Sequence, residues 1–137
     1  MDRPWDAPEL TARHRLPMHT LRHTGAEVGV ERLDLDGEWS SELFADPASA
    51  LACPTPRSRI TVPGAWTLQE FDDLHGVAPR PHYTNVQMPW PDLPPRPPAG
   101  NPTGVYERTL DLPESWAGRR VVLHVGAAES VRIVVVN

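Results

Sequence analysis

The sequence contains a single cysteine, Cys53, in 137 residues. A lone cysteine cannot form an intrachain disulfide, and no second cysteine is present to complete a cysteine-based metal cluster. We interpret Cys53 as a small, half-buried hydrophobic residue. The cysteine usage is compatible with a reducing cytoplasm.

Long apolar runs and a basic excess are also missing. No stretch approaches the ~20 residues of a membrane span, and the start of the chain lacks the basic-then-apolar pattern of a signal peptide. The formal net charge is −5, with acidic and basic residues interspersed. We therefore expect a cytoplasmic protein that binds neither nucleic acid nor a membrane.

Signals for long helices are scarce, whereas turn-forming residues are abundant. The 17 prolines and 9 glycines make up about 19% of the chain, against roughly 12% in average usage. Residues 1–30 are predicted to form an N-terminal arm. Within it, Asp6 followed by Glu9 fits a capping box, which predicts a short helix over residues 7–13.

Residues 31–137 are predicted to form an all-β domain. Alternation at Leu33 and Leu35, broken at Gly37, predicts a hairpin or tight corner between two strands. Further strands are expected at residues 60–62, 105–112, 119–125 and 130–136, with loops at 45–58 and 64–71 and a turn at 113–118. The strand at 130–136 is nearly apolar, so we expect it to be covered on both faces. Five to seven short strands separated by turns indicate an antiparallel β-sandwich.

The segment around Asn85 is the most distinctive loop. It is bounded by prolines, which fix φ and restrict the preceding residue, and it leads into the strand at 105–112. The side-chain amide of Asn85 offers two donors and one acceptor, which suit sugar hydroxyls but perform no proton chemistry. By residue type alone, the favoured interpretation of Asn85 is a turn residue that bonds its own backbone, and only the motif around it favours a functional role.

Several other side chains have two interpretations. His19 and His23 have the i, i+4 spacing of a metal pair, but no third ligand is evident, so we expect no metal site. His82 could reach a sugar, although a solvated loop position is favoured. Aromatic residues near strand ends could stack on sugars or pack internally, and packing is favoured; these residues are Trp39, Trp66 and Trp116.

The chain stops at Asn137, directly after an apolar strand. Asn is a common first residue of a two-residue hairpin turn, whose second residue and returning strand would come next. An uncovered apolar edge strand is also a liability. We therefore expect the domain to be incomplete at its C-terminus, as the N-terminal part of a longer chain.

Six short motifs follow one another along the chain. They are Leu35-Asp36-Gly37-Glu38-Trp39, Val62-Pro63-Gly64-Ala65-Trp66, Tyr83-Thr84-Asn85-Val86, Pro94-Pro95, Asn101-Pro102-Thr103-Gly104-Val105-Tyr106 and Gly126-Ala127-Ala128-Glu129-Ser130. In this order they resemble the motifs of glycoside hydrolase family 2 β-galactosidases. The leader from Arg3 to Pro17 also resembles the N-terminal arm of large members of this family. Two departures are a long link over residues 70–81, and Pro4 and Ala7 where some members carry metal ligands.

The resemblance implies a jelly-roll, galactose-binding-like domain that precedes a catalytic (β/α)8 barrel. Retaining hydrolysis uses two carboxyls about 5 to 5.5 Å apart; the family's barrel carries them, so no catalytic residue is assigned to this chain. Asn85 matches the family's substrate-contacting asparagine, and Val86 lines the same rim. The resemblance also implies Mg and Na ions in the full-length enzyme, the missing C-terminal domains as partners, and a homo-oligomer.

Two alternatives stay open from the sequence. One is a stand-alone carbohydrate-binding module, and the other is part of a family 2 β-glucuronidase or β-mannosidase. The resemblance favours an enzyme that hydrolyses terminal β-D-galactosyl residues in carbohydrate metabolism, with the 137-residue chain itself inactive.

Overall fold

A computed structural model describes residues 3–17, 31–52, 55–69, 85, 91, 95–98, 100–128 and 131–136. Contacts divide the chain into two compact units, Arg32–Leu110 and a second that combines Met1–Glu31 with Asp111–Asn137. The regular secondary structure consists of the strands β1 (Gly37–Phe44), β2 (Ser58–Val62) and β3 (Thr103–Glu107), the helix α1 (Pro47–Leu51), and 3-10 turns at Pro4–Asp6, Trp66–Leu68 and Glu114–Trp116.

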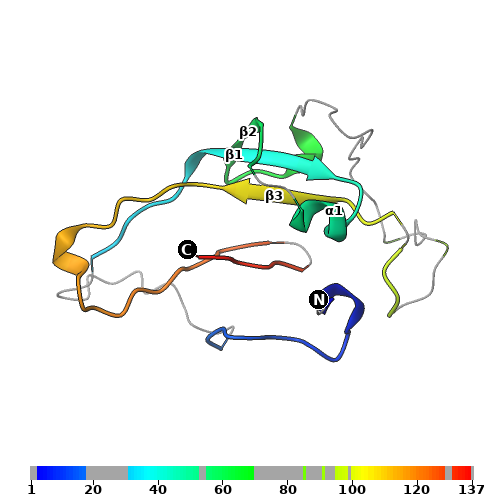
Figure 1. The fold of residues 1–137 in the computed structure, drawn as a ribbon, viewed down its shortest axis with the longest axis horizontal. Coiled ribbons are helices and arrows are strands. Elements are labelled where there is room, and N and C mark those ends of the chain that lie inside the picture. The colour runs from blue at the N-terminus through cyan, green and yellow to red at the C-terminus, as the bar shows by residue number, and fades with distance from the viewer. Residues whose placement is uncertain are drawn as a thin grey trace. The chain divides into compact units, whose positions relative to one another are not determined.

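The three strands form one antiparallel sheet in the order β2-β1-β3 (Figure 1). In the ladders, Trp39 lies opposite Ile60, and Ser41 lies opposite both Ser58 and Tyr106. This sheet, with very little helix, confirms the predicted all-β class. The described residues contain no second sheet, so the jelly-roll arrangement stays a prediction.

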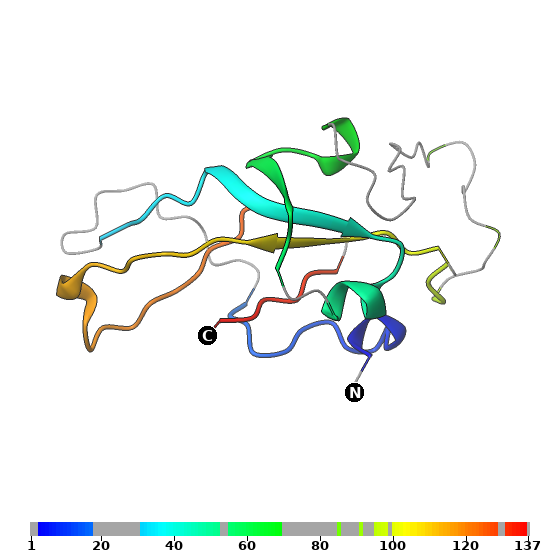
Figure 2. The ribbon, with the colours of Figure 1, turned by 45° about the horizontal axis from the view of Figure 1, so that its top comes forward.

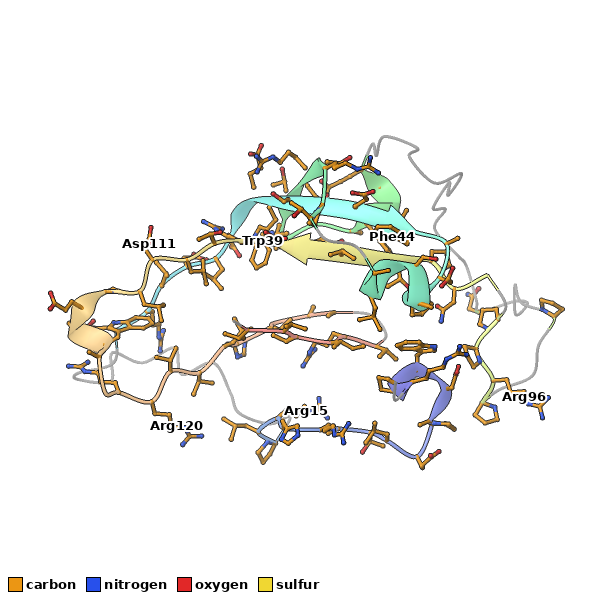
Figure 3. All side chains as sticks on the ribbon, in the orientation of Figure 1. Arg15, Trp39, Phe44, Arg96, Asp111 and Arg120 are labelled. Atoms are coloured by element: carbon orange, nitrogen blue, oxygen red, sulfur yellow. The ribbon has the colours of Figure 1, made fainter. Side chains whose placement is uncertain are left out.

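The central strand β1 carries the core. Its last four residues, from Ser41 to Phe44, are all buried, and Figure 3 shows Trp39 and Phe44 toward opposite ends of this strand. Leu43, Phe44, Ala50 and Ile60 are the buried hydrophobic residues among those described. Because successive strand side chains point to opposite faces, burial of four in a row means that both faces are covered here.

Helix α1 lies within residues 45–58, for which the sequence predicts only a loop. In the structure Asp46 is the N-cap of α1: its carboxylate accepts hydrogen bonds from the Ser49 amide at 2.9 Å and the Ser49 hydroxyl at 2.8 Å. Pro47 occupies the first helical position, where a missing N–H has no cost. The helix follows β1 and packs against β1 and β3 (Figure 2).

The predicted hairpin at Gly37 is wrong, because β1 begins there as one continuous strand. Gly37 adopts φ +122°, a conformation that glycine adopts without strain. Upstream, the backbone groups of residues 35 and 36 bond side chains rather than a strand partner. The Trp39 indole N–H donates to the Leu35 carbonyl at 2.8 Å, and the Asp36 amide donates to the Asp34 carboxylate.

The predicted strand over 60–62 is confirmed within β2, and that over 105–112 is confirmed in part. β3 begins at Thr103 and ends at Glu107, opposite Ser40. Beyond that point the Arg108 guanidinium donates to the carbonyls of Leu35 at 2.7 Å and Asp36 at 3.1 Å. These two carbonyls precede β1, so Arg108 holds the segment before β1 beside the residue that follows β3.

Two further predicted strands are not strands among the described residues, which here are 119–128 and 131–136. Burial of the last strand on both faces is also wrong, since Val135 and Val136 are 83% and 84% exposed. The β-branched composition of this segment suits a strand, but such a preference depends on packing against neighbouring strands.

The predicted helix over residues 7–13 is wrong as well. The arm instead contains the 3-10 turn Pro4–Asp6 and isolated turns, such as the hydrogen bond from the Leu10 amide to the Ala7 carbonyl at 2.9 Å. Pro8 disfavours helical geometry at Ala7 and supplies no N–H of its own. The expected turn at residues 113–118 is confirmed by the 3-10 turn Glu114–Trp116.

Candidate functional site

Asn85, the candidate substrate-contacting residue, lies in an exposed bend. Val86, which is predicted to line the rim of the same site, lies outside the described residues. The same holds for His19, His23, His82 and Cys53. An exposed position suits a ligand-contacting residue, and the assignment of Asn85 stays a prediction.

The segment that carries Asn85 connects Gln69 to Asn101. The side chain of Gln69 bonds Thr61 of β2, and Asn101 lies two residues before β3. A connection this long within a compact domain is typically functional. Its return is fixed by the Asn101 amide, which donates to the Ala45 carbonyl at 3.2 Å. The Thr103 hydroxyl in turn donates to the Asn101 carbonyl at 2.9 Å.

Trp66, just before the connection that carries Asn85, packs on β3, just after it. A Cβ built on Gly104 would lie 2.9 Å from two ring carbons of Trp66 and 2.8 Å from the Tyr106 ring. The indole therefore packs directly on the backbone of β3 at Gly104. Both ends of the Asn85 segment are thus anchored on the same sheet, which makes that sheet the scaffold of the loop.

Trp39 has contacts with the protein on its ring edge and its ring face. Its N–H donates to Leu35, and the Arg108 guanidinium carbon lies 5.8 Å from its ring centroid, within cation–π range. These contacts favour the packing role for Trp39 and Trp66. Sugar stacking by either residue has no support in these contacts.

Trp116 belongs to the other unit, where Glu31 gathers three donors. The Glu31 carboxylate accepts hydrogen bonds from the Ser115 hydroxyl at 2.9 Å and from the Trp116 indole N–H, and it pairs with Arg119 at 3.5 Å. The bonds from Ser115 and Trp116, with the Arg119 charge, lower the pKa of the Glu31 carboxyl. Trp116 thereby secures the 113–118 turn.

The electrostatics of the sheet are dominated by one buried carboxylate. Glu42 on β1 is 3% exposed, and Arg57 donates to it from Nη2 at 2.8 Å, from Nε at 3.3 Å and from the backbone N–H at 3.1 Å. Partial desolvation raises the pKa of the Tyr106 phenol on β3, although this residue is still 40% exposed. Sequence reasoning missed Glu42, because its partner lies 15 residues away and forms no local motif.

The described residues contain no group of three or more His, Cys, Asp or Glu side chains placed to hold a metal ion. Among the same residues, no helix has the length and apolar character needed to cross a membrane.

The motifs singled out in the sequence are largely scaffold. The motif at residues 35–39 starts β1, the motif at 62–66 ends β2 and places Trp66, and the motif at 101–106 forms β3. The three meet in one sheet, through the β1 ladders and the packing of Trp66 on Gly104. The motif that contains Asn85 and the motif Pro94-Pro95 belong to the long connection.

Comparison with known proteins gives consistent matches. The family model described as glycosyl hydrolases family 2, sugar binding domain, matches residues 33–137. The beta-galactosidase of Psychromonas ingrahamii is 35% identical over 133 residues, which cover 86% of this chain and 12% of that protein. The beta-galactosidase of Yersinia pestis is 32% identical in an alignment 143 residues long, which covers 93% of this chain and 13% of that protein.

This chain thus corresponds to 12 to 13% of the length of these relatives. No solved structure matches it significantly. The family match extends over both β1 ladders, the connection that carries Asn85 and the residues that follow β3. On this evidence, the chain belongs to the glycosyl hydrolase family 2 sugar-binding domains.

Proposed function

We propose that this chain is the sugar-binding part of a β-galactosidase that hydrolyses terminal β-D-galactosyl residues. The observation that carries the proposal is the family match over residues 33–137 together with relatives named beta-galactosidase. Those names favour a galactosidase over the glucuronidase and mannosidase alternatives. The same relatives are far longer than this chain, which favours part of an enzyme over a stand-alone module.

In this proposal the three-stranded sheet is a rigid base, and the connection between Gln69 and Asn101 presents Asn85 to the sugar. The amide of Asn85 binds galactosyl hydroxyls, and Val86 lines the rim of the same site. An asparagine orients a sugar but neither protonates nor attacks the glycosidic bond. The chain therefore contributes binding and orientation, while hydrolysis depends on two carboxyls supplied elsewhere in the polypeptide.

A paired activity assay tests the proposal. The complete polypeptide is assayed with aryl β-D-galactoside, β-D-glucuronide and β-D-mannoside of the same leaving group, beside the purified 137-residue chain. We expect the highest kcat/KM on the galactoside, and no turnover by the 137-residue chain above a mock preparation. A preference for the glucuronide or mannoside, or turnover by the short chain, would contradict the proposal.

A further inference from the structure

Strand β2 is one of the two outer strands of the described sheet, with β1 on its inner side. In an antiparallel ladder, every second residue of an outer strand directs its N–H and C=O away from the sheet. Thr61 is such a residue, since it lies opposite Glu38 and its backbone groups bond a side chain outside the ladder. Exposed groups of this kind are a template for pairing with another strand.

The side chain of Gln69 occupies this template. Its Oε1 accepts a hydrogen bond from the Thr61 amide at 3.2 Å, and its Nε2 donates to the Thr61 carbonyl at 3.1 Å. A primary amide offers the same acceptor and donor pair as the backbone of a neighbouring strand. Gln69 therefore replaces a partner strand at this point of the edge.

The local turn is built to bring Gln69 back onto β2. After Gly64 the chain makes the 3-10 turn Trp66–Leu68, and the backbone N–H of Gln69 donates to the Trp66 carbonyl at 3.2 Å. A Cβ on Gly64 would collide with Gln69 Nε2 and would lie 2.9 Å from the Thr61 carbonyl oxygen. Glycine at position 64 thus leaves room for the side-chain amide of Gln69.

A second copy of the same strand is the partner that suits this edge. Two β2 strands can pair antiparallel about a two-fold axis at Ile60, which puts Thr61 of each copy opposite Arg59 of the other. The two arginine charges then do not face each other directly, so they do not prevent the pairing. Ser-Arg-Ile-Thr-Val is also rich in residues that favour strands.

We propose that Gln69 is a built-in edge cap that prevents β2 from pairing with β2 of a second copy of this chain. The cap acts by occupying both outward backbone groups of Thr61. Its removal exposes the pair of groups around which the two-fold ladder would form.

The test compares four variants of the 137-residue chain with the wild type. Gln69→Ala removes the cap, Gln69→Met removes both hydrogen bonds but keeps a side chain of similar length, and Gly64→Ala displaces the Gln69 amide. The matched control is Leu68→Ala, which shortens a neighbouring side chain that is 78% exposed. Tryptophan fluorescence checks that each variant is folded.

We expect the Thr61 amide of the three cap variants to exchange with solvent about 2- to 10-fold faster than in the wild type in dilute solution. At higher concentration, sedimentation should detect more dimer for these variants than for Leu68→Ala. Mixed-label NMR should then find contacts between Thr61 of one copy and Arg59 of the other.

Unchanged exchange at Thr61 in a folded cap variant would overturn the proposal. Association no greater than that of Leu68→Ala, or association without contacts between the two β2 strands, would overturn it equally. If Gln69→Ala unfolds, the exchange and association of Gln69→Met test the proposal, because this variant retains most of the packing of the side chain.

Discussion

Glu42 is a buried carboxylate on the central strand, and Arg57 supplies three of its hydrogen bonds. The two partners differ in exposure: the Glu42 side chain is 3% exposed and that of Arg57 is 64% exposed. Loss of the arginine side chain leaves a charge inside the protein with fewer donors, whereas loss of the glutamate leaves a solvated guanidinium. Arg57 is therefore the more informative position to change.

We predict that Arg57→Ala lowers the free energy of unfolding by about 1 to 3 kcal/mol, because a buried carboxylate loses charged donors. The measurement is urea denaturation at neutral pH. Arg59→Ala is the matched control, since Arg59 and Glu38 form a 3.6 Å pair in which both side chains are about two-thirds exposed, and such pairs contribute about 0 to 1 kcal/mol. Equal losses for the two variants would contradict the special role of the buried pair.

At this scale the sequence predicted the residues that belong to local motifs and missed those that depend on distant partners. Asn85 was selected from its motif and its proline-bounded loop, and the structure describes it in an exposed bend. Arg108 was missed because its acceptors lie 72 and 73 residues earlier in the chain. Gln69 was missed because a glutamine has no propensity that marks it as an edge cap.

At the scale of elements, the turn at Trp66 packs closely on β3. This close approach is possible because Gly104 has no side chain. We predict that Gly104→Ala destabilises the protein by about 1 to 3 kcal/mol, because the added methyl group must displace aromatic rings of Trp66 and Tyr106. Thermal or urea unfolding measures the loss, and tryptophan fluorescence reports the displaced indole.

Gly100→Ala provides the control for this prediction. A Cβ at Gly100 meets nothing within 4 Å, so the substitution should leave the stability nearly unchanged. If Gly104→Ala were as mild as Gly100→Ala, the close packing of Trp66 on β3 would not anchor the connection that carries Asn85.

Helix α1 gives an element-scale prediction in pH. The amide and hydroxyl of Ser49 donate to the Asp46 carboxylate and lower its pKa below the ordinary value of 3.8. A carboxyl whose pKa is lowered by folding stabilises the folded state above its unfolded pKa and ceases to do so as pH falls through the folded value. The cap contribution should therefore be complete near pH 6, begin to fall as the pH approaches the ordinary value near 4, and be lost only below the lowered pKa of the folded state.

The measurement is the Tm of the wild type and of Asp46→Asn from pH 6 to pH 2. The wild type should lose more stability over this range than the variant, whose side chain does not titrate. Parallel curves would mean that ionisation of Asp46 contributes nothing to α1.

Prediction of the elements succeeded where a sequence pattern had a partner in the structure. β2 and much of β3 were predicted from alternation and turn residues, and both pair with β1. The predicted strands at 119–125 and 130–136 have strand-like composition but do not form strands among the described residues. Strand formation requires a ladder partner, which composition alone does not specify.

At the scale of the whole molecule, the chain belongs to a family of sugar-binding domains and corresponds to 12 to 13% of the length of relatives named beta-galactosidase. The β1 ladders, the packing of Trp66 on Gly104 and the Glu42–Arg57 pair hold the described sheet together. The proposed contribution to catalysis comes from Asn85, with Val86 at the rim of the same site. That contribution can be measured only within the complete polypeptide.

The most direct test is Asn85→Ala in the complete enzyme, assayed with two aryl β-galactosides that differ in leaving-group acidity. Loss of amide hydrogen bonds to the sugar should cost about 1 to 3 kcal/mol, or roughly 5- to 150-fold in kcat/KM for both substrates, with the Tm nearly unchanged. The two losses should be similar, because the asparagine contacts the galactosyl side and does not protonate the leaving group. An unchanged kcat/KM for both substrates would contradict the account, and a large fall in Tm would instead assign Asn85 to holding the loop.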